Sequence, residues 1–88
     1  MLEREVRIIN PLGLHARAAA KLVRCSLRYQ STVTLNRDGE RANAKSILSV
    51  LGLAAGFGSS VLIIVDGPDE IEVMKEIGVL FLSGFGEI

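Results

Sequence analysis

The stretch Gly13-Leu14-His15-Ala16-Arg17 contains the one histidine of this 88-residue chain. Glycine tolerates positive φ angles, so Gly13 allows a sharp turn just before the histidine. The alanine-rich run over residues 16–23 then favours a helix. His15 is therefore expected at the N-cap or first residue of a helix, directly after a corner.

This position indicates a chemistry for His15. A helix N-terminus presents free backbone N–H groups and a partial positive charge, which together attract anions. Arg17 adds a guanidinium group suited to phosphate within one turn of the helix. The combination predicts a histidine that carries a phosphoryl group, held by the helix end and the arginine.

The charges around His15 bear on the alternatives, because most lone histidines have no chemical role. The nearest acids in the sequence are Glu5 and Asp38, and every charged residue between them is basic. A metal site needs further His, Cys or carboxylate ligands, and a histidine general base is usually oriented by an acid. Because neither is local, a bound anion is favoured, and neither a metal nor a cofactor is expected.

Outward from this stretch, hydrophobic spacing and turn residues predict seven elements. They are strands at 2–9, 31–35, 40–44 and 61–65 and helices at 16–28, 46–52 and 69–83, with a hairpin turn at 37–39. The order β-α-β-β-α-β-α predicts an α+β open-faced sandwich, a four-stranded antiparallel sheet covered on one face by three helices. One domain is expected over residues 1–88.

Apolar residues at helical spacing predict which helix faces are buried. The first helix is expected to bury Ala19, Leu22, Val23, Ser26 and Leu27, and the last one Ile71, Met74, Ile77, Gly78 and Phe81. Ser46 and Asp69 are expected to cap the second and third helices. Cys25 is interpreted as a packing residue.

The charges are unevenly distributed although the formal net charge is zero. Residues 6–37 carry basic charges only, whereas the chain from Asp66 onward is mostly acidic. This pattern favours docking of acidic partners and argues against broad nucleic-acid binding. The charge-free residues 46–65 are interrupted by glycines and are interpreted as helix, loop and strand rather than a membrane span. A single cysteine excludes an internal disulfide and fits a reducing compartment such as the cytoplasm.

Two motifs carry a family resemblance. The segments at residues 10–17, Asn-Pro-Leu-Gly-Leu-His-Ala-Arg, and 43–47, Asn-Ala-Lys-Ser-Ile, resemble the two signatures of the HPr family. These proteins are small phosphocarriers of the phosphoenolpyruvate-dependent phosphotransferase system. The similarity extends over the whole chain to the Gly-Phe-Gly-Glu segment at 84–87. The family fold is the one predicted above.

The resemblance implies a phosphoryl relay. Enzyme I would pass a phosphoryl group to Nδ1 of His15, which would pass it to a histidine of an EIIA-type protein. Arg17 and the backbone N–H groups of Ala16 and Arg17 would hold the phosphoryl oxygens. The protein would thus be a carrier and not itself an enzyme, and a cytoplasmic monomer is expected.

The resemblance also implies a docking surface and a regulatory site. Residues at family contact positions are Ala20, Arg24, Arg28, Ile47, Leu48 and Leu51. The alternative for the three aliphatic residues is a place in the core, although a helix this short cannot easily bury them all. Ser46 matches the serine that HPr kinase phosphorylates in some lineages; the alternative is a plain N-cap serine.

One departure from the family pattern concerns the pathway. Many sugar-system members have a proline after the His-x-Arg sequence, where this chain has Ala18. The run at 15–23 is more similar to the nitrogen-related branch, so sugar uptake and a regulatory relay both stay open.

Three other classes of function are alternatives to the phosphocarrier. The first is a regulatory module that acts through Ser46 while His15 is idle. An enzyme with His15 as general base is a further alternative, but no acid partner or metal set supports it. An RNA-binding module would need aromatic residues on its sheet, and no aromatic residue falls in a predicted strand.

Overall fold

The structure is a computed structural model that describes residues 1–87. The chain forms β1 (Leu2–Arg7), α1 (Ala16–Leu27), β2 (Thr32–Arg37), β3 (Glu40–Asn43), α2 (Ile47–Gly52), β4 (Ser60–Asp66), α3 (Glu70–Leu82) and a 3-10 turn, η1 (Gly84–Gly86). This is the predicted element order, with η1 as an additional element. Most of the element boundaries differ from the predicted ones by one or two residues. No helix in the described part of the chain is long and apolar enough to cross a membrane.

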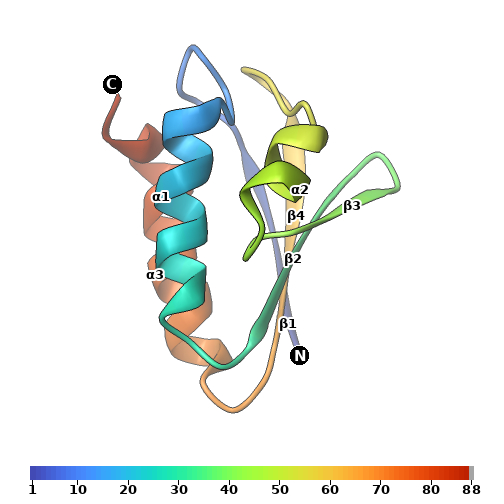
Figure 1. Cartoon of the computed structure of the whole chain (residues 1–88), viewed down its shortest axis with the longest axis vertical. Helices are drawn as coiled ribbons and strands as arrows, with labels where there is room; N and C mark the ends of the chain where they lie inside the picture. Colours follow the sequence, from blue (N-terminus) through green and yellow to red (C-terminus); the bar gives the residue numbers. More distant parts are fainter. Residues whose placement is uncertain (88) are drawn as a thin grey trace.

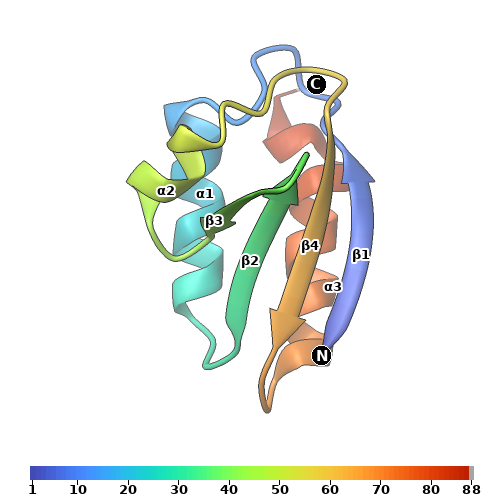
Figure 2. The same ribbon diagram turned by 90° about the vertical axis from the view of Figure 1, so that its right-hand side faces the viewer.

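The four strands form one antiparallel sheet in the order β1-β4-β2-β3 (Figure 2). β4 pairs with both β1 and β2, and its Ile63 lies opposite Arg4 on one side and Leu35 on the other. Within β4, Val61, Ile63 and Val65 are buried and alternate with more accessible residues. The predicted inner strand and the antiparallel sheet are therefore confirmed.

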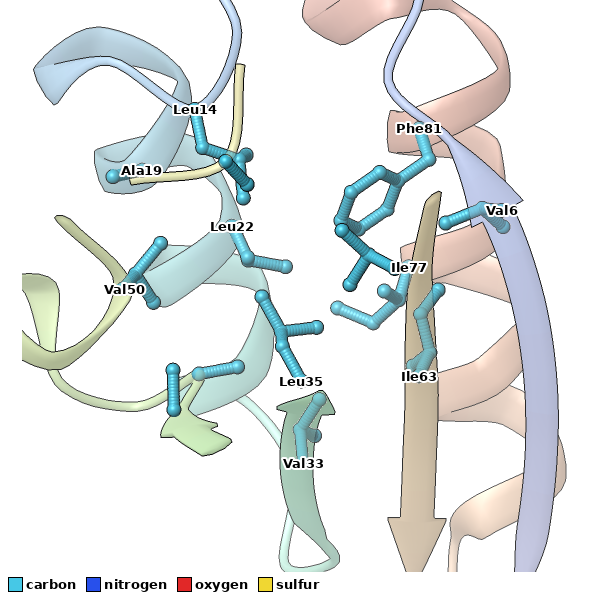
Figure 3. Close-up of a cluster of buried hydrophobic side chains, with 14 of the residues drawn as sticks. Val6, Leu14, Ala19, Leu22, Val33, Leu35, Val50, Ile63, Ile77 and Phe81 are labelled. Atoms are coloured by element: carbon cyan, nitrogen blue, oxygen red, sulfur yellow. The ribbon is translucent and has the colours of Figure 1, made fainter. Parts of the chain in front are cut away.

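The three helices lie on one face of the sheet (Figure 1). Between the two layers lies the hydrophobic core, where Leu22 of α1 and Ile77 of α3 meet Leu35 and Ile63 of the sheet (Figure 3). Cys25 is also buried, as predicted for a packing residue. Burial of this apolar surface is the main force that holds the helices on the sheet.

Two predictions about the helix faces are wrong. Ile71 is 77% exposed and Leu27 is 60% exposed. In α3 the first buried residue is Val73 instead, so the core-facing stripe begins two residues later. The first turn of α3 has apolar side chains on two faces, and the position of the sheet determines which face is buried.

The prediction that the Asp69 side chain caps α3 is also wrong. Asp69 occupies the N-cap position but makes no side-chain capping bond. Its carboxylate instead accepts hydrogen bonds from the backbone N–H groups of Gln30 (2.9 Å) and Ser31 (3.0 Å) and from the Ser31 hydroxyl. Asp69 therefore ties the start of α3 to the loop between α1 and β2.

This tie predicts a pH-dependent contribution to stability. The hydrogen bond from Ser31, followed by that from Gln30, lowers the pKa of Asp69 below its ordinary value. A lowered folded-state pKa stabilises the protein above the unfolded pKa of about 3.9, and this contribution is lost as the pH falls through the folded value. We expect Asp69→Asn to be less stable than wild type in urea unfolding at pH 7, and this difference to shrink at pH 2.5. A difference that stays constant between the two pH values would contradict the assignment.

Candidate functional site

His15 lies where the loop after β1 enters α1. It is the N-cap of α1, with extended backbone angles, and its side chain accepts a hydrogen bond from the Arg17 N–H. The preceding turn depends on Gly13, which has φ +66° and packs directly against the backbone of Ala55 and Gly56. The sequence predictions for these two residues are confirmed.

The two ring nitrogens of His15 have different partners. Nδ1 accepts from the Arg17 backbone N–H at 3.3 Å, so Nδ1 carries a lone pair and not a proton. Nε2 lies 2.5 Å from Oε2 of Glu87 and, in this tautomer, its N–H group donates a hydrogen bond to the carboxylate. The tautomer therefore follows from both partners together.

Glu87 corrects the expectation that no acid lies near the histidine. It is 72 residues away in the sequence and reaches His15 from the chain segment that follows η1. Its second oxygen, Oε1, accepts a hydrogen bond of 2.9 Å from Nδ2 of Asn10. The bond from Asn10 and the interactions with His15 and Arg17 lower the pKa of Glu87, although burial opposes this shift. Glu87 is therefore an anion at neutral pH.

The segment that carries Glu87 is held in place by packing and by one lysine. Phe85 is buried and makes an edge contact with Phe81 of α3, with ring centroids 5.0 Å apart. Lys21 of α1 donates to the Phe85 carbonyl at 2.6 Å. A hollow at this end of the molecule is lined by Pro11, Leu12, Arg17, Lys21, Gly86 and Glu87. The site thus combines the start of α1, the loop before it and the segment after α3.

The predicted docking residues are accessible. Leu48 is 78% exposed, and Ile47 and Leu51 are 39% and 36% exposed. Arg24 of α1 and Arg28, the C-cap of this helix, are exposed, and Ala20 is half-buried. α1, which begins directly after His15, contacts α2, so the docking residues lie on two adjacent helices (Figures 1 and 2). None of the three aliphatic residues belongs to the buried core, so the alternative that they are core residues is wrong.

Ser46 caps α2 as predicted. Its hydroxyl oxygen accepts a hydrogen bond of 3.3 Å from the Ser49 N–H. The Ser49 hydroxyl in turn accepts from the Asn43 N–H at 2.9 Å, which closes the turn before the helix. Ser46 itself is half-buried and directly precedes the first residue of α2 (Figure 2 shows the helix).

Comparison with known proteins decides the family. The family profile described as "PTS HPr component phosphorylation site" matches residues 2–82. The chain belongs to the HPr family. It is 49% identical over 87 residues to the phosphocarrier protein HPr of Cupriavidus necator, covering 99% of this chain and 98% of that one.

Relatives of two further kinds agree with this assignment. The phosphocarrier protein NPr of Proteus mirabilis is 46% identical over 85 residues, which cover 96% of this chain and 94% of that one. The crystal structure of an HPr from Thermoanaerobacter tengcongensis matches with a TM-score of 0.96 at 36% identity, covering 100% and 99% of the two chains. The protein is thus an HPr phosphocarrier of the phosphotransferase system, and its fold is the HPr fold.

Proposed function

We propose that His15 accepts a phosphoryl group from phosphorylated enzyme I on Nδ1 and passes it to an EIIA-type protein. The observation that carries this proposal is the pair of partners on the His15 ring. Nε2 is engaged with Glu87, while Nδ1 has a lone pair beside the helix N-terminus. A neutral imidazole with a bare Nδ1 is the species that can attack phosphorus.

The helix end would hold the transferred group. The N–H···N distance of 3.3 Å from Arg17 to Nδ1 is longer than a typical hydrogen bond, so this bond can be given up at little cost. The freed N–H group of Arg17, the N–H group of Ala16 and the exposed Arg17 guanidinium would then donate to phosphoryl oxygens. Because Arg17 is exposed, the group would stay accessible to the next acceptor.

The test is transfer of labelled phosphate from phosphoenolpyruvate through purified enzyme I. Sugar-type and nitrogen-type enzymes I would be used separately, each first shown to be active on another carrier. We expect acid-labile phosphate on His15, located by mass spectrometry of peptides, and the faster donor indicates the branch. Absence of label with both donors would contradict the relay.

The exposed leucine on α2 provides a prediction about docking. We expect Leu48→Glu to raise the KM for enzyme I about tenfold or more, because a charge replaces an apolar contact at the interface. Ile71→Glu is the matched control, since Ile71 is 77% exposed but lies on α3. Steady-state phosphorylation rates measure both effects, and an equal rise in KM for the two variants would contradict the proposed surface.

We also propose that Ser46 is a phosphorylation site for an HPr kinase. Aspartate can keep the N-cap of α2 while it adds a negative charge beside the docking surface. Ser46→Asp is therefore expected to raise the KM for enzyme I several-fold with little change in stability. Ser46→Ala should leave KM unchanged but lower the free energy of unfolding by about 1 kcal/mol. Equal KM values for all three proteins would argue for a plain capping role.

A monomer in the cytoplasm is proposed for this chain. Among its relatives, the catabolite repression protein Crh of Bacillus subtilis is described as a swapped, intertwined dimer, and one Thermoanaerobacter tengcongensis HPr as a dimer. The oligomeric state of this protein can be measured directly by light scattering.

A further inference from the structure

Asn10 is a buried polar residue in the loop between β1 and α1. Its side chain is 0% exposed, and its Nδ2 donates to the Gly13 carbonyl at 2.7 Å and to Oε1 of Glu87 at 2.9 Å. Both neighbours are acceptors, so the amide nitrogen and not the oxygen has to face them. One N–H group of this amide is thus used within the loop that leads to His15, and the other connects this loop to Glu87.

The remaining atom of this amide is unpaired. Oδ1 of Asn10 is buried and accepts no hydrogen bond from any of residues 1–87. A buried polar atom without a partner costs about 1–3 kcal/mol. The turn is already closed by the hydrogen bond from the Gly13 N–H to the Asn10 carbonyl at 3.0 Å. Turn closure alone therefore does not explain a buried asparagine here, and its bond to Glu87 needs its own explanation.

The bond from Asn10 acts directly on the carboxylate that contacts His15. Among the interactions that lower the pKa of Glu87, the hydrogen bond from Asn10 is the largest. Asn10 binds Oε1, which leaves Oε2 directed at Nε2 of His15. The three side chains thus form a chain of hydrogen bonds that ends on the nitrogen opposite the proposed nucleophile.

We propose that Asn10 is a positioning residue for phosphoryl transfer, which acts on His15 through Glu87. The inference rests on the proposed role of His15. Asn10 orients the carboxylate, and the carboxylate keeps the proton on Nε2 and covers that nitrogen. Nδ1 is then the one ring nitrogen with an available lone pair.

The same arrangement serves both directions of transfer. In the inward step the lone pair of Nδ1 forms the N–P bond, and the donor's bond to phosphorus breaks with its electron pair leaving to the donor. Nε2 keeps its proton, so the ring becomes a cation, which the Glu87 carboxylate stabilises in place. In the outward step the N–P electron pair returns to Nδ1, and the neutral imidazole with its proton on Nε2 is restored.

Chemical phosphorylation with phosphoramidate tests this inference without a partner protein. We expect wild type to take the phosphoryl group on Nδ1 in at least about tenfold excess over Nε2, the ratio that 1.36 kcal/mol produces. Asn10→Ala and Glu87→Ala should lose this preference and give substantial Nε2 product, measured by phosphorus and nitrogen NMR. Glu76→Ala removes an exposed acid of α3 and is the matched control.

A double-mutant cycle distinguishes positioning from a purely structural role. If Asn10 acts through Glu87, the double variant should show the same product ratio as Glu87→Ala alone. With enzyme I as donor, each single variant should lower kcat about tenfold at unchanged KM, which corresponds to loss of a transition-state interaction. Asn10→Ser is the second variant if Asn10→Ala does not fold, because its shorter side chain can still hydrogen-bond within the turn but does not extend as far as Oε1 of Glu87, so the Nδ1 preference should again be lost.

The outcomes separate this inference from the proposed function. A folded Asn10 variant or a Glu87→Ala variant that keeps the Nδ1 preference would overturn it, and so would additive effects in the cycle. If phosphoramidate labels Nδ1 of wild type and the variants lose the preference while enzyme I labels none of them, the positioning role stands and the relay is wrong.

Discussion

Replacing His15 with alanine is expected to abolish phosphoryl transfer from enzyme I completely. The group forms a covalent bond to Nδ1, and the described part of the chain has no second histidine that could replace it. Loss of a residue that only stabilises the transition state leaves a slower phosphorylation rate, but loss of the nucleophile should leave none. The measurement is incorporation of acid-labile phosphate, with EIIA-type phosphorylation as the downstream readout.

His15→Asn makes this prediction sharper than alanine alone. Asparagine is among the best N-cap residues, so it can keep the acceptor for the Arg17 N–H while it removes the nucleophile. It cannot replace the bond from Nε2 to Glu87, so we expect its free energy of unfolding to fall by about 1 kcal/mol while the protein stays folded. Phosphorylation of the folded His15→Asn protein would show that another residue accepts the group. A regulatory role for the chain that survives this substitution would favour the Ser46 alternative.

Local features of the site could be predicted from the sequence because they depend on neighbouring residues. Gly13, His15 and the alanine-rich run specify a turn, an N-cap and a helix within one short segment, and the structure places all three as expected. The hairpin at Asp38 and Gly39 is similar: both residues have positive φ, as a two-residue turn between antiparallel strands requires. Ser46 likewise caps the helix that begins at the next residue.

Glu87 could not be predicted, because its contact with His15 depends on the tertiary structure. The two residues are brought together by α3 running back along the sheet and by η1, in which Phe85 adopts φ +56° and packs on Phe81. Hydrophobic spacing places Phe81 on a buried face but does not indicate where the segment after the helix turns. The family resemblance covered this glutamate, but it gave the residue no role.

The packing of α3 shows a second limit. Ile71 and Val73 are two residues apart and equally apolar, and the helical period allows a stripe that begins with either of them. In the structure Val73 is buried and Ile71 is exposed. The capping prediction for Asp69 is wrong for a related reason, since its hydrogen bonds go to a loop 38 or 39 residues earlier in the chain instead of to its own helix.

Gly13→Ala is expected to destabilise the protein more than any substitution on its surface. A Cβ atom at this position would lie 2.7 Å from the Ala55 carbonyl oxygen and 2.7 Å from Cα of Gly56. These are backbone atoms, and the Ala55 oxygen also accepts the Leu14 N–H at 2.9 Å, so the two loops cannot separate without losing this bond. With the strain of φ +66° added, we expect a loss of about 3 kcal/mol in the free energy of unfolding, measured in urea.

Gly39→Ala separates the two causes of this loss. Gly39 has φ +85°, but a Cβ atom there would meet nothing within 4 Å. Gly39→Ala should therefore lower the free energy of unfolding by about 1–2 kcal/mol, through backbone strain alone. The phosphorylation rate of this variant should equal that of wild type. Gly13→Ala should in addition slow phosphoryl transfer, because the displaced loop carries Asn10 and leads directly into His15. Equal losses of stability in the two variants would mean that the close approach of the 10–14 loop to Ala55 and Gly56 contributes nothing, and that the site is not held by that contact.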